Sequence, residues 1–240
     1  MIVVVAALAE ELAPLARRLA APRRLAAART MDAVEGRLAG ATLRLIATGA
    51  GGVRARAGLR RALAGDAAGC ERLILLGVAG GLDPRLATAE VVRVGRVVSL
   101  RADAAAGGAP AEHRVAGDAS GVALTVDRIV ADAAEKQALW QSLGRPGAAV
   151  VDMESFHWIA TLAELPTAPP HIVLRAVSDT AAVSLPSFLP LCVGPGGEIS
   201  RVRVAARTLT RPRSLGALMR LRRDVRAAAE RLADAVEEVL

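Results

Sequence analysis

The chain has 240 residues, of which 53% are hydrophobic and 23% charged, and its formal net charge is +7. A composition this apolar buries a large core, which excludes an intrinsically disordered chain, and the length suits one α/β domain or two small ones. Tyrosine is absent, and the chain has only two Phe and two Trp. An aromatic platform for stacking single-stranded nucleic acid is therefore not expected, and we predict no nucleic-acid partner.

The cysteines and the N-terminal segment favour a cytoplasmic protein. Cys70 and Cys192 are too few and too far apart for a disulfide framework or a zinc site, and they are typical of small buried side chains in a reducing compartment. The first apolar run has no basic segment before it and ends at Glu10 and Glu11, which is unlike a signal peptide. No stretch reaches the roughly 18–20 apolar residues of a membrane span.

Apolar runs and helical spacings alternate along the first three quarters of the chain. The run Ile2–Ala7 is led by β-branched residues, which indicates a strand buried on both faces. Helical spacing begins at Glu10 and ends at Pro22, and Gly95 is a candidate bulge in a longer strand. Further strands are predicted at residues 34–38, 41–47, 73–76, 91–100, 122–126, 148–151 and 171–177, further helices begin near 53, 131 and 156, and residues 103–120 are expected to form a loop.

This alternation predicts an α/β fold with a mostly parallel sheet. The composition changes after Asp179, where residues 181–193 are apolar and contain prolines, while residues 200–240 are basic with helical spacing. Nearly all of the positive charge is arginine, and Lys136 is the only lysine. No linker interrupts the chain, so we predict a single domain over residues 1–240, with 181–240 as an apolar and then basic helical extension.

Polar or glycine-containing turns follow five of the predicted strands. Ligands of open α/β sheets bind beyond the carboxyl ends of the strands, so these turns are candidate site segments. Neither glycine turn has the spacing of a dinucleotide-binding or P-loop motif, and the three histidines lack metal-ligand spacing, so we predict no metal. Each turn alone also has an ordinary structural explanation, such as a helix cap or a tight connection. The five segments are Glu10-Glu11, residues 48–52, residues 77–82, Asp152 with Glu154, and Asp179.

Taken in order, these segments resemble the purine nucleoside phosphorylase and nucleosidase superfamily, in particular its methylthioadenosine/adenosylhomocysteine nucleosidase-like branch. The resemblance extends over residues 1 to about 181. It implies a single-domain α/β/α sandwich with a central mixed, mostly parallel sheet, and cleavage of the N-glycosidic bond to a purine without a cofactor. The motifs that carry it are Ala9-Glu10-Glu11, Thr48-Gly49-Ala50-Gly51-Gly52-Val53, Gly77-Val78-Ala79-Gly80-Gly81-Leu82, Val151-Asp152-Met153-Glu154 and Arg175-Ala176-Val177-Ser178-Asp179.

The resemblance also implies a role for individual residues. Glu154 matches the glutamate that binds the ribose hydroxyls, and Met153 matches the methionine that packs on the sugar. Asp179 matches the acid that protonates the departing purine at N7, a task that requires a carboxyl pKa raised by burial. Ser178 is expected to orient Asp179. Glu11 matches the base that activates the attacking water. The alternatives are that Glu11 is an ordinary glutamate in the first turn of a helix, or that the neighbouring Glu10 is the base.

Two departures from the family pattern affect the substrate. The family usually has Ser-Ala-Gly-Gly where this chain has Val78-Ala79-Gly80-Gly81, so one hydrogen bond is lost while Gly80 is retained as a substrate-binding position. Ile129 stands where an aromatic residue would stack on the purine, and it packs on the base without stacking. These changes disfavour a small methylthioadenosine substrate. They do not affect the residues matched to the ribose and to purine N7, which are Glu154 and Asp179.

The first loop favours water over phosphate as the nucleophile. The phosphorolytic branch has a Gly-Asp-Pro-x-Arg loop after its first strand, and an arginine before the second glycine turn. Residues 7–11 and Leu75-Leu76 occupy those places here. Arg54, Arg56 and Arg101 keep phosphate open as a co-substrate, although the alternative that they are surface arginines is favoured.

The C-terminal quarter resembles a sub-branch, the hopanoid-associated phosphorylase-like nucleosidases. That resemblance implies adenine release from adenosylhopane, whose hydrocarbon is membrane-resident, with a methylthioadenosine/adenosylhomocysteine nucleosidase or a purine nucleoside phosphorylase as alternatives. Residues 211–226 then become a candidate contact with the inner face of the membrane, because arginines and an apolar stripe share one helix. The alternative is that the stripe packs on the domain. The family is usually oligomeric, and we expect a homodimer. The matching segments are residues 184–189, 194–197 and 211–224, together with Asp152-Met153-Glu154-Ser155.

Overall fold

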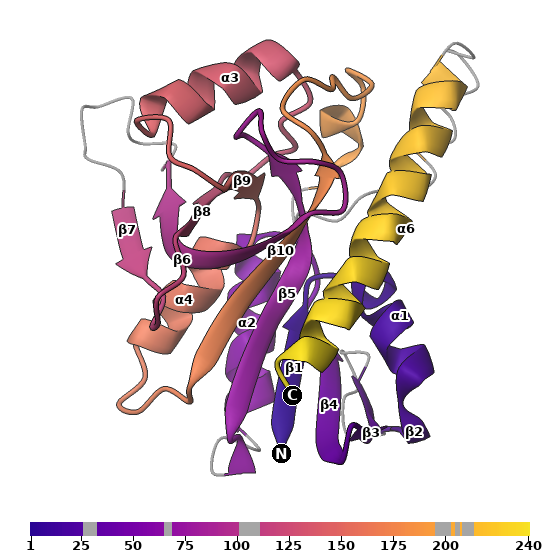
Figure 1. The fold of residues 1–240 in the computed structure, drawn as a ribbon, viewed down its shortest axis with the longest axis vertical. Coiled ribbons are helices and arrows are strands. Elements are labelled where there is room, and N and C mark those ends of the chain that lie inside the picture. Colours follow the sequence, from indigo (N-terminus) through magenta and orange to yellow (C-terminus); the bar gives the residue numbers. More distant parts are fainter. Residues whose placement is uncertain (26–32, 65–68, 101–110, 195–202, 205–206, 208–213) are drawn as a thin grey trace.

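The first apolar run forms a central strand, β1 (Ile2–Ala6), in which every residue is buried. It pairs in parallel with β4 (Ala41–Ala47) on one side and β5 (Arg72–Gly81) on the other (Figure 1). Both of its faces pack in apolar clusters, as its unbroken apolar sequence predicts. The coordinates are a computed structural model. They describe the whole chain except residues 26–32, 65–68, 101–110, 195–202, 205–206 and 208–213.

Strands and helices alternate as predicted, with boundaries that shift by a few residues. The strands after β1 are β2 (Ala20–Arg24), β3 (Ala33–Leu38), β4 (Ala41–Ala47), β5 (Arg72–Gly81), β6 (Val91–Ser99), β7 (Ala111–Arg114), β8 (Gly121–Thr125), β9 (Ala149–Asp152) and β10 (His171–Asp179). The helices are α1 (Ala9–Arg18), α2 (Gly52–Ala64), α3 (Ala133–Ser142), α4 (Ser155–Ala163), the short η3 (Pro190–Cys192) and α6 (Leu215–Glu238).

The sheet closes on itself around β5. Its strand order is β10-β6-β8-β9-β5-β1-β4-β3-β2, and an additional pairing joins β10 to β5, so that β5, β10, β6, β8 and β9 form a ring. The sheet is mixed, as predicted, but it is not mostly parallel, because parallel and antiparallel pairings are equal in number among the described strands. The register of β6 against β8 shifts between Val94 and Arg96, which places a bulge at Gly95.

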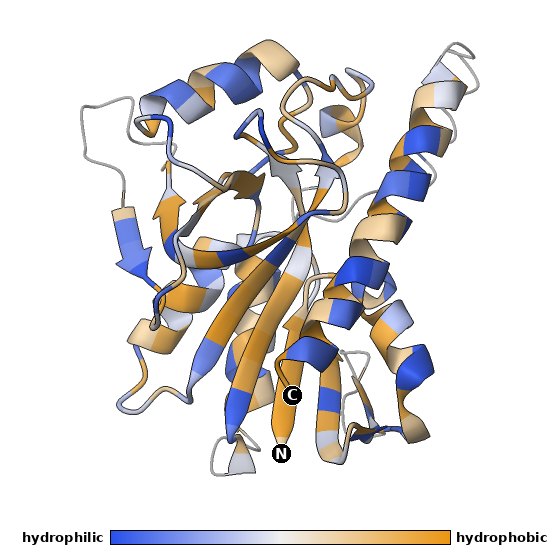
Figure 2. Cartoon of the chain, in the orientation of Figure 1, coloured by the Kyte–Doolittle hydropathy of each residue, from blue (hydrophilic) through white to orange (hydrophobic). Residues whose placement is uncertain are grey.

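Helices cover both faces of the sheet and complete an α/β/α sandwich. One core cluster contains apolar side chains of α2 and α4 with one face of β1 and β5, and a second contains those of α1 and α6 with the opposite face. Figure 2 shows the apolar strands between these helices, whose outer surfaces are more polar. The nucleoside phosphorylase-like sandwich predicted from the sequence is therefore confirmed.

Three local predictions differ from the structure. Residues 77–81 were expected to form a turn, but they continue β5, which pairs with both β10 and β9 there. Ser178 and Asp179 likewise belong to β10. The described part of the expected loop at 103–120 contains β7, and β2 is an additional, fully exposed edge strand. The extension of β5 and β10 comes from pairing with strands that are distant in the sequence, whereas β7 and β2 pair with their neighbours β6 and β3.

The last helix, α6, packs on the sheet with one half and extends beyond it with the other (Figure 1). Ala228, Ala229, Leu232, Ala233 and Val236 are buried against the sheet and α1. The first turns carry exposed Leu215 and Met219, together with exposed arginines. Within the described helices, none is long and apolar enough to cross a membrane.

Candidate active site

Glu11 lies in the first turn of α1 and connects that helix to β5. Its Oε2 accepts a hydrogen bond from the Leu8 backbone N–H at 2.8 Å, and its Oε1 accepts one from the Val78 N–H at 2.8 Å. The first contact is the helix-capping role that remained open in the sequence. The second is a tertiary contact that capping does not require. Burial raises the pKa of the Glu11 carboxyl, and the Val78 hydrogen bond opposes that rise.

Glu154 reaches the glycine turn from the opposite side. Its Oε1 accepts a hydrogen bond from the Gly51 backbone N–H at 2.8 Å. Gly49 and Gly51 both have positive φ angles, which only glycine adopts readily, so the turn needs these residues in order to present its N–H group. Burial, followed by the negative charge of Asp152, raises the pKa of Glu154 to about 7. Glu154 is therefore poised to change its charge near neutral pH.

Asp152 and Arg175 form a buried ion pair behind Glu154. Arg175 Nε donates to Asp152 Oδ2 at 2.6 Å, and both side chains are almost fully buried. The Thr125 hydroxyl donates to the other carboxylate oxygen at 2.7 Å. Asp152 also accepts from the Ser155 N–H and hydroxyl at the start of α4, so its predicted role as a turn acceptor is present together with the ion pair.

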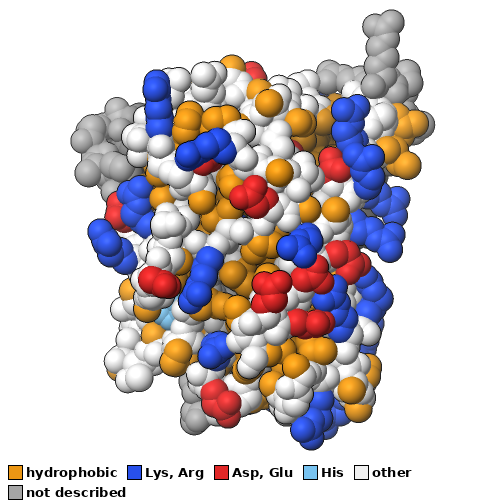
Figure 3. All heavy atoms as spheres, viewed as in Figure 1, with side chains coloured by type: hydrophobic (Ala, Val, Ile, Leu, Met, Phe, Trp, Pro, Cys, Tyr) orange, Lys and Arg blue, Asp and Glu red, His pale blue; other side chains and the backbone are white. Residues whose placement is uncertain are grey.

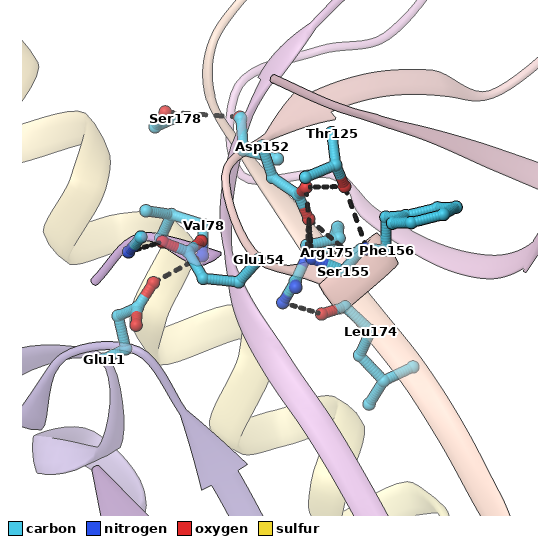
Figure 4. Close-up of polar contacts among 12 residues, drawn as sticks. Glu11, Val78, Thr125, Asp152, Glu154, Ser155, Phe156, Leu174, Arg175 and Ser178 are labelled. Atoms are coloured by element: carbon cyan, nitrogen blue, oxygen red, sulfur yellow. Dashed lines mark hydrogen bonds and ion pairs between the residues drawn. The ribbon is translucent and has the colours of Figure 1, made fainter. Parts of the chain in front are cut away.

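One nitrogen of Arg175 remains available. Its Nη2 atom is buried and has no hydrogen-bond partner among the described residues. A Cβ atom on Gly77 would lie 2.7 Å from Arg175 Nη1 and 3.1 Å from Glu11 Oε1, so the guanidinium and that carboxylate both approach the same point of β5. Figure 4 shows Glu11 and Glu154 on one side of this strand, with the Asp152–Arg175 network beyond Glu154.

Asp179 ends β10, and hydrogen bonds hold both of its carboxylate oxygens. The Ser178 hydroxyl donates to Oδ1 at 2.6 Å, which is the orienting contact expected from the sequence. The Lys136 ammonium donates to Oδ2 at 2.5 Å. A Cβ atom on Gly80 would lie 3.3 Å from the same Oδ2, so Gly80 borders the carboxylate directly.

Strand β5 brings the two carboxylate groups of the site together. Val78 holds Glu11, and Gly80 borders Asp179 two residues further along. Two residues of an extended strand span ~7 Å, which is the scale of a ribose with its attached base. Glu11 and Glu154 therefore form one end of a candidate site, and Asp179 forms the other.

Met153 and Ile129 are placed less distinctly. Met153 is half-buried between β9 and α4. Ile129 is half-buried and packs against an apolar cluster centred on three buried residues, Phe188, Leu189 and Cys192. Leu185, Leu218 and Leu221 join the same cluster, so the apolar segment after β10 and the start of α6 meet beside Ile129.

The clearest surface cavity lies next to this site without including its carboxylates. It has a volume of about 430 Å³ and lies on the α4 and β7 side. Arg56, His113, Phe156 and His157 are among the residues that line it. Glu11, Glu154 and Asp179 do not contribute to its walls. Arg101, one of the three arginines considered for phosphate, lies outside the described residues.

The sequence interpretation missed two features of this site. Lys136 was noted only as the single lysine, and the partner of Asp152 was not anticipated. The one signal for Lys136 was its rarity, since 30 of the 31 basic residues are arginines. Arg175 was part of a recognised motif, but nothing local indicated that it would pair with a carboxylate of another strand.

The comparison with protein families agrees with this geometry. The family model for the phosphorylase superfamily matches residues 1–120, which is half of the chain and includes Glu11 and the strand that holds it. The chain belongs to the phosphorylase superfamily. No curated protein sequence matches this superfamily member.

Solved structures share the fold over nearly the whole chain. The 5′-methylthioadenosine/S-adenosylhomocysteine nucleosidase of Neisseria meningitidis, in complex with methylthio-immucillin-A, superposes with a TM-score of 0.72 at 21% identity, covering 99% of this chain and 97% of that one. A putative nucleosidase of the same type from Borrelia burgdorferi, bound to adenine, gives 0.69 at 13% identity, covering 100% and 98%. A futalosine hydrolase mutant of Helicobacter pylori gives 0.59 at 15% identity, covering 74% and 89%. At these identities the likeness establishes the fold of this phosphorylase-superfamily chain.

Proposed function

We propose that this chain is a purine nucleosidase that hydrolyses the N-glycosidic bond of a 5′-substituted adenosine and releases adenine. The observation that carries the proposal is the convergence of Glu11 and Glu154 on β5 and the glycine turn, with both carboxyl pKa values raised. Groups whose pKa lies near the working pH exchange protons most effectively during catalysis. Asp179 provides a third buried carboxyl group at the other end of the same strand.

Glu154 and Glu11 have different roles at the sugar. Glu154 accepts hydrogen bonds from the ribose hydroxyls, and its negative charge stabilises the oxocarbenium-like transition state. Glu11 takes a proton from the attacking water, while the unpaired Nη2 of Arg175 supplies a donor that holds this water. Met153 packs on the sugar between them.

Asp179 acts at the base. As the glycosidic bond breaks, its electron pair moves onto the purine, and a proton delivered to N7 makes adenine a neutral leaving group. Asp179 delivers this proton, while Ser178 holds its orientation and Gly80 leaves room beside it. Ile129 then packs against the base from the apolar cluster.

The charge around Glu11 favours water over phosphate. Glu11, Glu154 and Asp152 are three buried carboxyl groups around one buried cation, Arg175. A phosphate dianion placed there would meet repulsion from the carboxylates, whereas a neutral water would not. We therefore propose hydrolysis without a cofactor. If the alternative, phosphorolysis, takes place, added phosphate will increase the rate of base release.

The proposed substrate is adenosylhopane, and the second candidate is a methylthioadenosine or adenosylhomocysteine nucleoside. The apolar cluster beside Ile129 supports the first, because the 181–193 segment then offers apolar side chains to a hydrocarbon on the 5′ carbon. The second is supported by the fold shared with the Neisseria meningitidis nucleosidase. Both substrates present the same ribose and adenine to the site.

Adenine release from purified protein tests the reaction and the substrate together. We expect release from adenosylhopane in mild detergent, and a loss of about 10²–10⁴-fold in kcat for Asp179→Asn. Asp118→Asn, the same substitution at an exposed aspartate, is the matched control and should keep full activity. Efficient cleavage of methylthioadenosine without cleavage of adenosylhopane would select the second substrate. An unchanged rate in Asp179→Asn would refute the proposed acid.

Membrane contact is the proposed way for such a substrate to reach the site. The first turns of α6 expose Leu215 (53%) and Met219 (60%) next to exposed Arg220, Arg223 and Arg226. Figure 3 shows basic side chains gathered along this edge of the molecule. Exposed apolar residues flanked by arginines suit an anionic bilayer surface. A homodimer remains our expectation for the assembly.

Sedimentation with lipid vesicles tests this contact. We expect binding to vesicles containing phosphatidylglycerol, little binding to vesicles of phosphatidylcholine alone, and weaker binding as salt increases. Leu215→Ser combined with Met219→Ser should release the protein from the vesicles. Val53→Ser, which changes another exposed apolar residue on α2, serves as the control. Equal binding by the double variant would place the contact elsewhere or remove it.

A further inference from the structure

The only lysine of the chain is buried at the centre of the candidate site. Lys136 lies in α3 with none of its surface exposed, although the other residues of that helix are at least partly exposed. Its ammonium donates to three acceptors: Asp179 Oδ2 at 2.5 Å, the Thr180 carbonyl at 3.0 Å and the Val183 carbonyl at 2.9 Å. All three ammonium hydrogens are therefore used, and none remains for a ligand.

Stability alone does not explain a charge in this position. Removing an ammonium and a carboxylate from water is costly, and replacing a buried ion pair with apolar side chains of similar size is often neutral or stabilising. Apolar side chains lie on the same part of the fold, where Val151, Leu139 and Leu143 belong to one cluster. The ion pair therefore points to a role at the carboxylate itself.

Lys136 also connects three segments that surround the base end of the site. The chain after β10 is attached to the beginning of α3 by two further hydrogen bonds, from the Leu185 N–H to the Ala131 carbonyl and from the Ala133 N–H to the Ser184 hydroxyl. The Lys136 ammonium adds a third hydrogen bond between α3 and this segment, to the Val183 carbonyl, and it also donates to Asp179. The orientation of the carboxylate and the course of the following segment are thus fixed by one side chain.

We propose that Lys136 is the positioning residue of Asp179, and that it keeps Oδ2 of this carboxyl group as a hydrogen-bond acceptor while the acid proton resides on Oδ1, so that the site selects purines with a 6-amino group. The inference rests on the proposed function, which places the purine beside Asp179. Because the Lys136 ammonium donates to Oδ2, the proton that Asp179 delivers to N7 is carried by Oδ1, and Oδ2 offers a ligand only lone pairs. An exocyclic amine donates to them, whereas the carbonyl oxygen of a 6-oxopurine meets them as a second acceptor.

Removal of the ammonium should change this preference. Without the ammonium, the acid proton of Asp179 can reside on Oδ2 as well as on Oδ1. That hydrogen can be donated to the oxygen of a 6-oxopurine. The discrimination between 6-amino and 6-oxo substrates is therefore expected to depend on a lysine that does not touch the substrate.

The test compares one substrate with its 6-oxo counterpart. The pair is adenosylhopane, or methylthioadenosine where the wild type cleaves it, and the inosine analogue made from it by deamination. In Lys136→Met, which keeps the chain length without the charge, we expect the ratio of kcat/KM for the amino over the oxo substrate to fall at least tenfold. Gln137→Met, an exposed substitution on the same helix, should keep the wild-type ratio. A purely structural role would lower both rates together and leave the ratio unchanged.

Chemical rescue distinguishes the loss of the Lys136 positive charge from the loss of its side-chain volume. In Lys136→Ala, added ethylammonium should restore the ratio and ethanol should not, because only the former replaces the positive charge. Circular dichroism and gel filtration confirm folding, and Lys136→Gln replaces Lys136→Met if that variant does not fold. A ratio within threefold of wild type in a folded variant, or equal rescue by ethanol, overturns this inference while the wild-type enzyme still releases adenine. A wild type that releases adenine from neither substrate overturns the proposed function, and this inference with it.

Discussion

Replacement of Glu154 by glutamine should stabilise the protein above neutral pH while removing the carboxylate that we propose to bind the sugar. In the folded protein, burial and the charge of Asp152 raise the pKa of Glu154 from 4.5 to about 7. At about 1.4 kcal/mol for each pH unit, this difference corresponds to about 3 kcal/mol. The folded state binds this proton more tightly than the unfolded chain does. The free energy of unfolding therefore falls as pH rises from about 4.5 to about 7, and the full cost is present above pH 7.

Glutamine does not titrate, and its Oε1 can still accept the Gly51 hydrogen bond. We expect Glu154→Gln to be more stable than wild type by about 3 kcal/mol at pH 8, and by close to zero at pH 4.5. For a chain of this length, that difference raises Tm by roughly 6–12 °C at pH 8. Urea denaturation of both proteins across this pH range measures the difference directly.

The control is Glu164→Gln, which changes an exposed carboxylate just beyond the end of the same helix. It should show no comparable pH-dependent gain. Glu11 is present in both proteins of the main comparison, so its own raised pKa cancels. A stability difference that is the same at pH 5 and pH 8 would refute the reasoning, because it would show that the Glu154 carboxyl group titrates normally in the folded state.

Three further substitutions test other parts of the site. Asp152→Asn leaves the Arg175 charge buried without its carboxylate, and we expect the free energy of unfolding to fall by about 3–5 kcal/mol in urea denaturation; a loss below 1 kcal/mol would contradict a buried pair. Glu11→Gln should lower kcat for adenine release by about 10²–10⁴-fold, and a variant with more than a tenth of wild-type activity would remove it as the base. Gly80→Ala places a methyl group 3.3 Å from Asp179 Oδ2, so kcat should fall with a stability loss of about 1–3 kcal/mol, and unchanged kinetics would show that the carboxylate moves freely.

The sequence predicted the site carboxylates because they lie at the ends of strands. Glu11 follows β1, which is an unbroken apolar run, and Asp179 ends β10, which is mostly apolar and contains Arg175. Parallel neighbours bring their carboxyl ends to one edge of the sheet, so the order of these motifs carried most of the information on the site. The resemblance to a known superfamily rested on the same segments, and the family match confirms it.

The glycines of β5 show where local interpretation failed. A run such as Gly77 to Gly81 is normally a turn, because glycine weakens a strand. Here these residues stay extended between β10 and β9, and Gly77 is needed because the Arg175 guanidinium approaches to a distance that excludes a Cβ atom. The requirement comes from a side chain about a hundred residues away in the sequence.

Lys136 could not have been placed in the site from its own neighbourhood. Its helix is polar on most sides, with exposed residues on either side of the lysine. The acceptor that makes its burial possible is 43 residues further along the chain. Contacts of this kind depend on the closure of the ring around β5, which joins β9 and β10 to the same strand.

The contact between the first and last helices has a consequence for the order of folding. Arg17 and Arg18, at the end of α1, form ion pairs with Glu230 and Glu237 of α6, and the first of these pairs spans 213 residues of sequence. The buried half of α6 packs against α1 and the strands it covers. A ribosome therefore synthesises Glu11 long before α6, and the helix that carries Glu11 gains its last support only when α6 emerges. Until then, a nascent chain has all the site carboxylates and one of them is not yet fixed in place.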